Sequence, residues 1–401
     1  MKLLEKRMFR KFDYFSMAIV LAIFLFGLLT LMNATAQPFS GDEYGWGEIV
    51  EKLDLHTVLL QFMWFLVGVA GMGALIILDY STYGELYKII YWGGVALLLA
   101  VLFLGRVIRG TQGWFQIGSR GFQPAEFVKI ALIIVLAKVA ANRSDPARGI
   151  TTFREALPIL GYLILPVALV MSQPDWGTAF VYIVICAGIL LAARISLKMV
   201  GILLAIAIPV ALLLYFFLMA DWQFSRILSF LNPEADALGA GMQVMRSKEV
   251  IASGGLTGKG LFAESTLSQL GYLPDHQTDF IFAVVVETFG WTGGLCLILL
   301  YAALLIRLIT LSFSANDRFG SFIIIGVMSM YAFHIIENIG MVCGVLPVTG
   351  IPLPFVSYGG SSMLTNMLAL GLVQNVAMRR MPRQKRRFYV DPSERAADMA
   401  T

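Results

Sequence analysis

Residues 271–290 read GYLPDHQTDFIFAVVVETFG and mark the point where a long polar loop runs into an apolar helix. The proline in 273–275 disfavours helical angles in the residue before it, so this tripeptide predicts a stiff lead-in. Thr278 and Asp279 then precede the apolar run 280–286, where a short polar side chain can accept the free N–H groups of a first helical turn. Asp279 therefore has two interpretations, a helix N-cap or a base at a membrane–water boundary.

The composition predicts an integral membrane protein. The chain has 401 residues, of which 58% are hydrophobic and only 14% are charged. A soluble domain carries roughly a quarter charged residues, so this chain has too little charge to coat a water-soluble particle of its size. The three cysteines lie in or beside apolar runs without a CxxC spacing, and the three histidines are far apart. Neither set indicates a disulfide framework or a dedicated metal site.

The hydropathy pattern predicts an all-α fold, a single polytopic domain over residues 1–401 with about ten transmembrane helices. Basic residues gather at both ends of the chain and at each turn expected on the inner side, so both termini are placed in the cytoplasm. Residues 220–279 form a large extracytoplasmic loop between spans seven and eight, and 380–401 form a basic cytoplasmic tail. The spans are about 14–32, 57–78 and 89–104, one starting near 122, one ending near 171, one following 173–178, and then about 199–219, 280–306, 319–342 and 363–378.

Residues 106–129 carry three candidate residues. Four glycines and a proline predict an irregular segment, with Trp114 as either an aromatic anchor at the interface or a substrate contact. Glu126 and Lys129 follow on the fourth span and are three residues apart, so they share one helix face. An unpaired charge in lipid costs at least roughly 2.5–3.5 kcal/mol, which leaves two interpretations: a structural ion pair, or the lining of a cavity for an anionic substrate.

Two connections hold further candidates. Residues 173–178 read QPDWGT, a tight external turn in which Asp175 is the candidate for function. The large loop is rich in glycine, and 243–251 is expected to form a short helix. Its glycines allow close backbone approach to a ligand, and its basic residues could hold a pyrophosphate; the candidates among them are Arg226, Arg246 and Lys248.

The last two spans enclose a broken segment. Residues 345–362 read VLPVTGIPLPFVSYGGSS, and their prolines and glycines forbid a regular helix. Irregular backbone at membrane depth survives only when it is packed in protein or lines a water-filled cavity. Just before it, His334 and Glu337 are three residues apart, and we expect them to bond each other.

The strings LPDHQTDFIFAVVVETFG and VTGIPLPFVSYGGSS identify a resemblance. With QPAEFVK (123–129), QPDWGTA (173–179) and QVMRSKEVIASGGLTGKG, they resemble, in the same order, the SEDS (shape, elongation, division and sporulation) proteins, and RodA more than FtsW. The resemblance covers nearly the whole chain.

The resemblance implies a peptidoglycan glycosyltransferase of the bacterial cytoplasmic membrane. Such enzymes polymerise lipid II into undecaprenyl-linked glycan at the outer face, beside a class B penicillin-binding protein transpeptidase and other cell-elongation proteins, with no nucleic acid. The family's essential aspartate falls on Asp279, its external tryptophan on Trp114, and its cavity charges on Glu126 and Lys129. Ser357 and Ser361 of the closing signature are further substrate-binding candidates. Gly113, His276 and Thr288 depart from the family pattern.

The chemistry implied is one in-line displacement with inversion, because an α-linked pyrophosphate donor gives a β-1,4-linked polymer. It needs a base at the acceptor hydroxyl, for which we take Asp279, and positive charge at the leaving pyrophosphate. A divalent cation is the one cofactor left open, without a dedicated site in the sequence. The rival functions are a lipid II flippase, for which the polar groups would line a path, and a scaffold that only recruits the transpeptidase.

Overall fold

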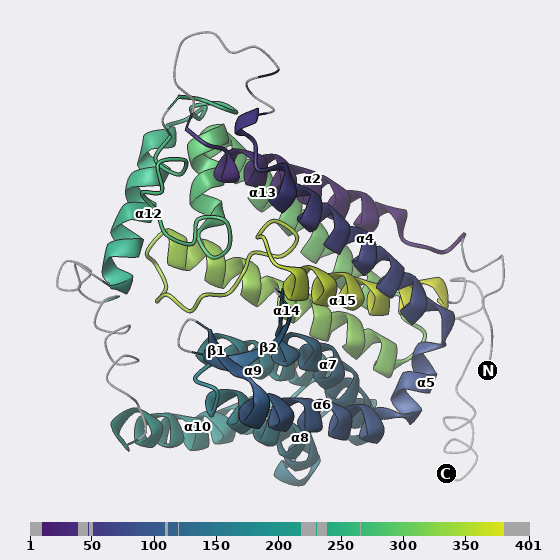
Figure 1. The fold of residues 1–401 in the computed structure, drawn as a ribbon. Coiled ribbons are helices and arrows are strands. Elements are labelled where there is room, and N and C mark those ends of the chain that lie inside the picture. Colours follow the sequence, from purple (N-terminus) through teal and green to yellow (C-terminus); the bar gives the residue numbers. More distant parts are fainter. Residues whose placement is uncertain are drawn as a thin grey trace, which may run out of the picture.

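The computed structural model describes residues 10–38, 47, 51–108, 111–118, 120–217, 230, 239–264 and 266–380. Most of this part of the chain is helical (Figure 1). The helices are α2 (Tyr14–Thr35), α4 (Leu55–Ile77), α5 (Tyr80–Glu85), α6 (Tyr87–Leu104), α7 (Pro124–Arg143), α8 (Phe153–Met171), α9 (Trp176–Ala192), α10 (Leu197–Phe217), α12 (Ala240–Gly254), α13 (Ile281–Ser312), α14 (Arg318–Val342) and α15 (Gly360–Met378).

Every segment predicted to span the membrane coincides with one of these helices. Six of them are long and apolar enough to cross a bilayer, namely α2, α4, α6, α8, α13 and α14. Helix α9 and the part Leu197–Pro209 of α10 are apolar but shorter. The number of crossings remains a prediction. The short helix expected in the large loop is α12, while the tail beyond residue 380 and most of residues 218–238 lie outside the described residues.

The expectation of an irregular segment around Trp114 is wrong. The described residues on either side of Trp114 form a three-stranded antiparallel sheet in the order β1 (Arg106–Ile108), β2 (Thr111–Ile117) and β3 (Arg120–Phe122). Gly118 takes a positive φ of 64° at the turn between β2 and β3, and Gly121 lies opposite Gln116. These glycines suit a tight hairpin, because Gly118 supplies the left-handed turn and Gly121 leaves room for the Trp114 ring.

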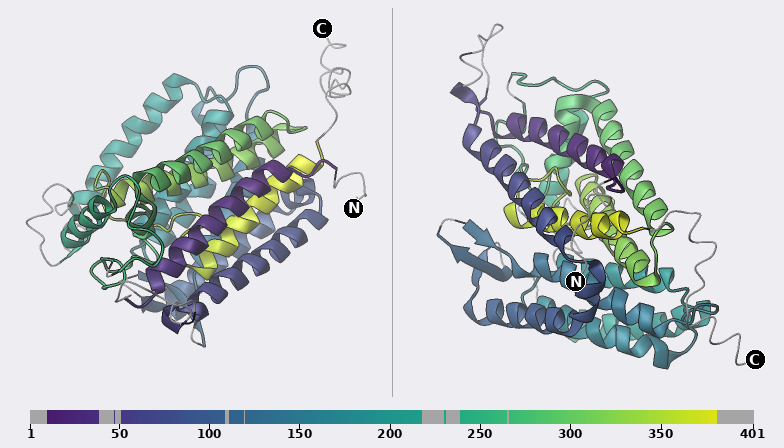
Figure 2. Two further views of the ribbon diagram at one scale, coloured as in Figure 1. Left: turned by 90° about the horizontal axis from the view of Figure 1, so that it is seen from above. Right: turned by 90° about the vertical axis from the view of Figure 1, so that its right-hand side faces the viewer.

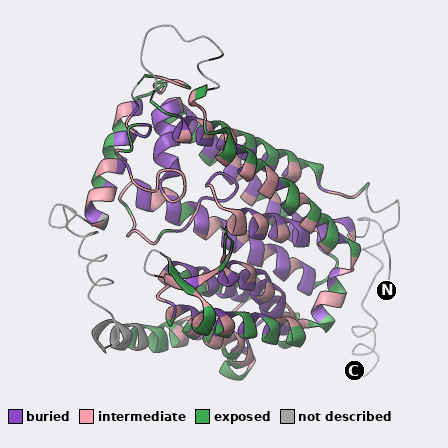
Figure 3. Ribbon diagram, in the orientation of Figure 1, coloured by how far each residue is buried: buried purple, intermediate pink, exposed green. Residues whose placement is uncertain are grey.

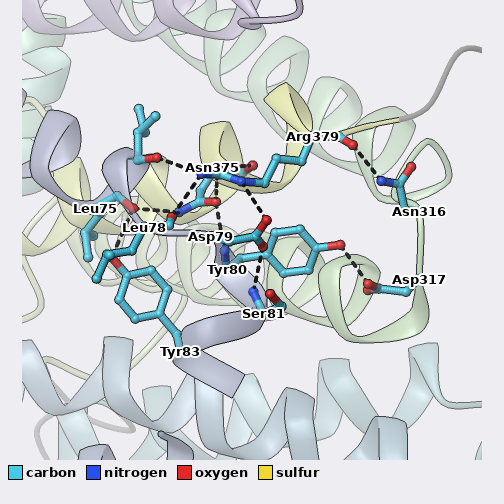
Figure 4. Close-up of polar contacts among 11 residues, drawn as sticks. Leu75, Leu78, Asp79, Tyr80, Ser81, Tyr83, Asn316, Asp317, Asn375 and Arg379 are labelled. Atoms are coloured by element: carbon cyan, nitrogen blue, oxygen red, sulfur yellow. Dashed lines mark hydrogen bonds and ion pairs between the residues drawn. The ribbon is translucent and has the colours of Figure 1, made fainter. Parts of the chain in front are cut away.

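Contacts between distant segments define one end of the bundle, which we call the basic end. Arg307 near the end of α13 pairs with Asp13 at the start of α2, and Arg318 at the start of α14 donates to the Ser144 carbonyl after α7. Figure 4 shows the densest part of this end, where Arg379 at the end of α15 pairs with Asp79 before α5.

The opposite end, which we call the loop end, gathers the irregular segments. It contains the hairpin 106–122, the turn 172–175, the loop 255–280 and the broken segment 343–359. Asn33 at the end of α2 joins this end, since its amide donates to Thr288 Oγ1 at 2.8 Å and accepts from the Phe262 backbone N–H at 2.9 Å.

Helix α14 lies at the centre of the described helices. In the most apolar stretch of α14, 67% of the residues are buried, against 28% in the most apolar stretch of α4. It packs against α7, α9, α13 and α15, and α4 and α15 lie side by side (Figure 2). Figure 3 shows the buried residues concentrated on these inner helices. Polar side chains on α14 can therefore reach several elements at once.

The glycine-rich stretch of the large loop packs against α13. Helix α13 is kinked at Gly290, which has φ 70° and ψ −175°. The Gly260 N–H donates to the Thr288 carbonyl, and a Cβ at Gly290 would collide with the Leu256 carbonyl. Glu287 is fully buried and accepts from Lys259 Nζ at 2.9 Å and from two backbone N–H groups of the loop. The glycines 254, 258 and 290 thus bring the loop onto α13, where we had expected an approach to a ligand.

We expect Gly290→Ala to lower the melting temperature sharply. The φ and ψ of Gly290 lie in a region that only glycine adopts readily, so the substitution costs about 2 kcal/mol or more. Thermal unfolding of the purified protein in detergent measures the effect. Gly161→Ala is the matched control, because Gly161 lies within α8 with open space at its Cβ position, and there alanine gains about 1 kcal/mol. Equal melting temperatures for the two variants would contradict this account of the kink.

Candidate functional site

Three consecutive backbone carbonyls before α13 are each held by a donor from α14 or from the segment between α14 and α15. The Gln277 carbonyl accepts from the Tyr358 N–H at 3.0 Å, and the Thr278 carbonyl accepts from Ser357 Oγ at 2.6 Å. The Asp279 carbonyl accepts from Asn338 Nδ2 at 2.8 Å. The lead-in predicted from sequence is therefore fixed by contacts from much later in the chain.

Asp279 is not the cap of α13. Phe280 occupies the cap position, and no side-chain cap hydrogen bond is present there. The Asp279 residue is half-buried, and its carboxylate faces Gly350, where a Cβ would lie 3.4 Å from Oδ2. Gly350 has a φ of 74°, so glycine suits the position both for its backbone and for the room it leaves the carboxylate.

Ser357 acts on the backbone around Asp279. The side chain is 3% exposed, and its hydroxyl both donates to the Thr278 carbonyl and accepts from the Leu353 N–H at 2.8 Å. Gln61 of α4 holds the same segment, since its amide donates to the Ser357 carbonyl at 2.9 Å. The hydroxyl of Ser357 is thus already engaged, and we interpret the residue as a support for Asp279 in place of a substrate contact.

Asp175 caps α9 and joins it to α7. Its carboxylate accepts from the Thr178 N–H at 3.0 Å, from Thr178 Oγ1 at 2.8 Å and from Gln123 Nε2 at 2.9 Å. Burial raises the pKa of the Asp175 carboxyl, against the opposing effect of the Thr178 hydrogen bonds. The Gln123 N–H in turn donates to Ser361 Oγ at 3.3 Å. Gln123 therefore bridges Asp175 and Ser361, because its side-chain amide donates to the first and its backbone N–H donates to the second.

The Asp175 turn also touches the broken segment beside Asp279. A Cβ at Gly177 would lie 3.2 Å from the Thr349 carbonyl and 3.0 Å from Ile351 Cγ1, so the two residues flanking Gly350 pack on this turn. Thr349 Oγ1 donates to Glu337 on α14 at 2.8 Å. These contacts place the Asp175 turn beside the segment that holds Gly350, which the Asp279 carboxylate faces.

Glu126 and Lys129 form an ion pair one turn deeper. Lys129 Nζ lies 2.6 Å from Glu126 Oε1 and 3.2 Å from His334 Nε2. Glu126, Lys129 and His334 are 4%, 1% and 1% exposed. Lysine can only donate, so His334 Nε2 accepts and its proton is on Nδ1. The expected bond between His334 and Glu337 is wrong: His334 contacts Lys129, while Glu337 accepts from Thr349.

Trp114 lies at the same end of the bundle but on the other face of the hairpin. Its indole packs over Gly121, where a Cβ would lie 2.9 Å from Cε3. The preceding residue, Gly113, faces Gln173 and Gln123, with a Cβ position 3.4 Å from Gln173 Oε1. Successive residues on a strand face opposite sides, so the Trp114 ring points away from these two amides.

Two basic candidates of the large loop, Arg246 and Lys248, lie on α12. Arg246 donates to the Tyr272 carbonyl at 2.9 Å and stacks over the Tyr272 ring at 4.8 Å. Lys248 is exposed and lies across Gly344, at the start of the broken segment. Arg226 lies outside the described residues. Lys248 therefore lies beside the start of the segment that holds Thr349 and Gly350.

The sequence did not point to Asn338, Gln123 or Gly350, each of which holds a candidate in place. A polar residue on a largely apolar span was the available signal for Asn338. Among the described residues, no three His, Cys, Asp or Glu side chains gather as a metal site. The acids instead have separate partners, such as Lys129 for Glu126 and Lys259 for Glu287.

Comparisons with known proteins give a consistent result. A family model described as a cell cycle protein of the FtsW, RodA and SpoVE type matches residues 14–381. Stage V sporulation protein E of Bacillus subtilis is 34% identical over 374 residues, covering 91% of this chain and 96% of that protein. Peptidoglycan glycosyltransferase MrdB of Escherichia coli is 34% identical over 358 residues, covering 89% and 91%.

Two solved structures share the fold. A chain from a peptidoglycan synthase complex, described for its structural coordination of polymerization and crosslinking, has a TM-score of 0.75 and 29% identity, covering 92% of this chain and 98% of that one. The rod shape determining protein RodA of Thermus thermophilus has a TM-score of 0.65 and 26% identity, covering 92% and 98%.

We expect Lys129→Met to destabilise the protein by about 3–5 kcal/mol, because it leaves the Glu126 carboxylate buried without its partner. The double variant Glu126→Gln with Lys129→Met removes both charges and should recover most of that loss. Unfolding in detergent micelles measures both variants. A double variant as unstable as the single one would show that the ion pair is not the source of the effect.

Proposed function

Because the chain belongs to the FtsW, RodA and SpoVE family of cell cycle proteins, we propose that it is a RodA-like peptidoglycan glycosyltransferase. Its substrate is lipid II, which it polymerises into β-1,4-linked glycan. The similarity to MrdB, a peptidoglycan glycosyltransferase, supports the enzyme class, and the helices long and apolar enough to cross a bilayer support a multi-pass protein of the cytoplasmic membrane. The loop end faces outward, and both termini are cytoplasmic.

The reaction is a single displacement at the anomeric carbon of the donor sugar. The acceptor 4-hydroxyl attacks, the bond to the α-linked pyrophosphate breaks, and inversion gives the β-linkage without a covalent enzyme intermediate. The acceptor hydroxyl must lose its proton as it attacks, and the leaving pyrophosphate gains negative charge. The chain must therefore provide a base and, separately, positive charge.

Asp279 is the proposed base, and the observation that carries this assignment is a held backbone beneath a carboxylate that faces Gly350. The residue is half-buried against Gly350, while its own carbonyl is held by Asn338. The other acids at the loop end are less suited to the role. Glu126 and Glu287 are buried in ion pairs. A base must be held firmly and still reach its substrate, and Asp279 meets both needs.

Positive charge at the pyrophosphate comes from Lys129 and from basic residues of the large loop. Lys248 is exposed beside Gly344, at the edge of the broken segment, and suits a first contact with the anion. Lys129 is the deeper, buried member of this set, and it is paired with Glu126. Arg246 and Arg226 complete the proposed set, with Arg246 already stacked on Tyr272. These steps use only the chain's own side chains.

The proposed partner is a class B penicillin-binding protein transpeptidase, within the group of cell-elongation proteins. The similar chain in a peptidoglycan synthase complex that coordinates polymerization and crosslinking supports this proposal.

We expect Asp279→Asn to lower the rate of lipid II polymerisation by about 100-fold or more, because general-base catalysis contributes roughly 10²–10⁴ in rate. The assay uses purified, folded protein and labelled lipid II, with the polymer separated by gel. Glu264→Gln is the matched control, since it removes an exposed carboxylate from the same loop and should leave the rate unchanged. A wild-type rate for Asp279→Asn would remove this residue from the mechanism.

Vesicles reconstituted with lipid II separate the enzyme from a flippase. Polymer formed without movement of lipid II between leaflets supports the glycosyltransferase. Movement without polymer, unaffected by Asp279→Asn, would favour transport. A scaffold that only recruits the transpeptidase would form no polymer in either experiment.

Trp114→Ala separates two roles of the tryptophan. If the ring contacts substrate, the variant loses about tenfold or more in rate at an unchanged melting temperature. The comparison of polymerisation rate with thermal unfolding decides the matter. If the melting temperature falls steeply instead, the ring is a structural anchor of the hairpin through its packing on Gly121.

A further inference from the structure

Asn338 of α14 joins the two backbone segments on either side of the Asp279 carboxylate. The residue is fully buried, and its Nδ2 donates to the Asp279 carbonyl at 2.8 Å and to the Ile351 carbonyl at 2.8 Å. The first bond holds the residue that carries the carboxylate. The second holds the residue next to Gly350, which the carboxylate faces.

We propose that Asn338 is a positioning residue for the reaction, which sets the place of the Asp279 carboxylate relative to the segment that contains Gly350. This inference rests on the proposed function, because it assigns to Asn338 a role in presenting the base. It is a role through Asp279, and Asn338 itself makes no contact with substrate.

The chemistry of the side chain fits this role. A carboxamide nitrogen carries two hydrogens and can donate to two carbonyls at once, which a carboxylate or an aliphatic side chain of similar size cannot do. Both hydrogens of Asn338 are used in this way. Its Oδ1, however, is buried without a hydrogen-bond partner among the described residues, which is unfavourable. Stability alone therefore gives an incomplete reason for this amide.

The chain contains a matched control at the basic end. Asn375 of α15 is also fully buried, and its Nδ2 donates to the Leu75 carbonyl at 2.6 Å and to the Leu78 carbonyl at 2.8 Å (Figure 4). It makes the same kind of double contact to backbone, but with no connection to Asp279. A comparison of the two residues separates a general structural effect from a specific effect on the base.

The experiment measures lipid II polymerisation by Asn338→Leu and Asn375→Leu, as kcat and KM per folded protein, alongside their melting temperatures. We expect both variants to lose melting temperature. Asn338→Leu should lose about tenfold to 100-fold in kcat with KM changed by less than about twofold, because a small displacement of a reacting group has effects of this size. Asn375→Leu should keep a kcat close to wild type.

Equal kcat values for the two leucine variants would overturn the inference, because the effect would then be general. If Asn338→Leu does not fold, Asn338→Ser replaces it: one hydroxyl donor can hold one carbonyl, so we expect a smaller but measurable loss of kcat, and a wild-type kcat overturns the proposal. Asp279→Asn is measured in parallel. If that variant polymerises normally, the proposed function fails; if it is inactive while Asn338→Leu and Asn338→Ser keep the wild-type kcat, only the role of Asn338 fails.

Discussion

The hydrogen bonds to the carbonyls of residues 277–279 are the contacts on which the rest of the loop end depends. In an apolar surrounding, an irregular backbone keeps its place only if its polar groups find partners within the protein. Here the partners come from Asn338, Ser357 and the Tyr358 backbone N–H. Ser357 and Tyr358 belong to the broken segment, and Asn338 also donates to the Ile351 carbonyl within it. The broken segment and the lead-in to α13 therefore hold each other in place. The Asp279 carboxylate then faces Gly350 from a backbone that is held in place.

Helix α14 spaces the two charges of the proposed reaction. His334 and Asn338 are four residues apart, so they share one face and lie about 6 Å apart along the axis. The first contacts Lys129 of α7, and the second holds Asp279. The proposed base and the deeper cation are thus both positioned by contacts with the same buried helix. A shift of α14 would move both contacts together, which keeps their spacing constant.

The sequence predicted the helices well because a long apolar run has few alternatives. It also predicted the broken segment, since prolines and glycines exclude a helix there. The hairpin around Trp114 was missed, because glycines that serve a tight turn look the same in sequence as glycines of an irregular loop. Of the two interpretations of Asp279, the cap is wrong for a related reason. Local spacing permits a cap, but the helix begins after Phe280, and the Asp279 carbonyl is held by Asn338, which is distant in sequence.

The glycine-rich loop is a second case in which the sequence pattern did not reveal what its residues do. Glycines beside lysines fit a site for a phosphate, yet Gly258 and Gly290 bring two backbones together and Lys259 pairs with the buried Glu287. A buried carboxylate needs charge and donors from the protein itself, and this loop supplies both. The loop's basic charge is therefore partly consumed in holding the loop on α13. What remains for an anionic substrate is the exposed charge at the edge, and Lys248 is placed there.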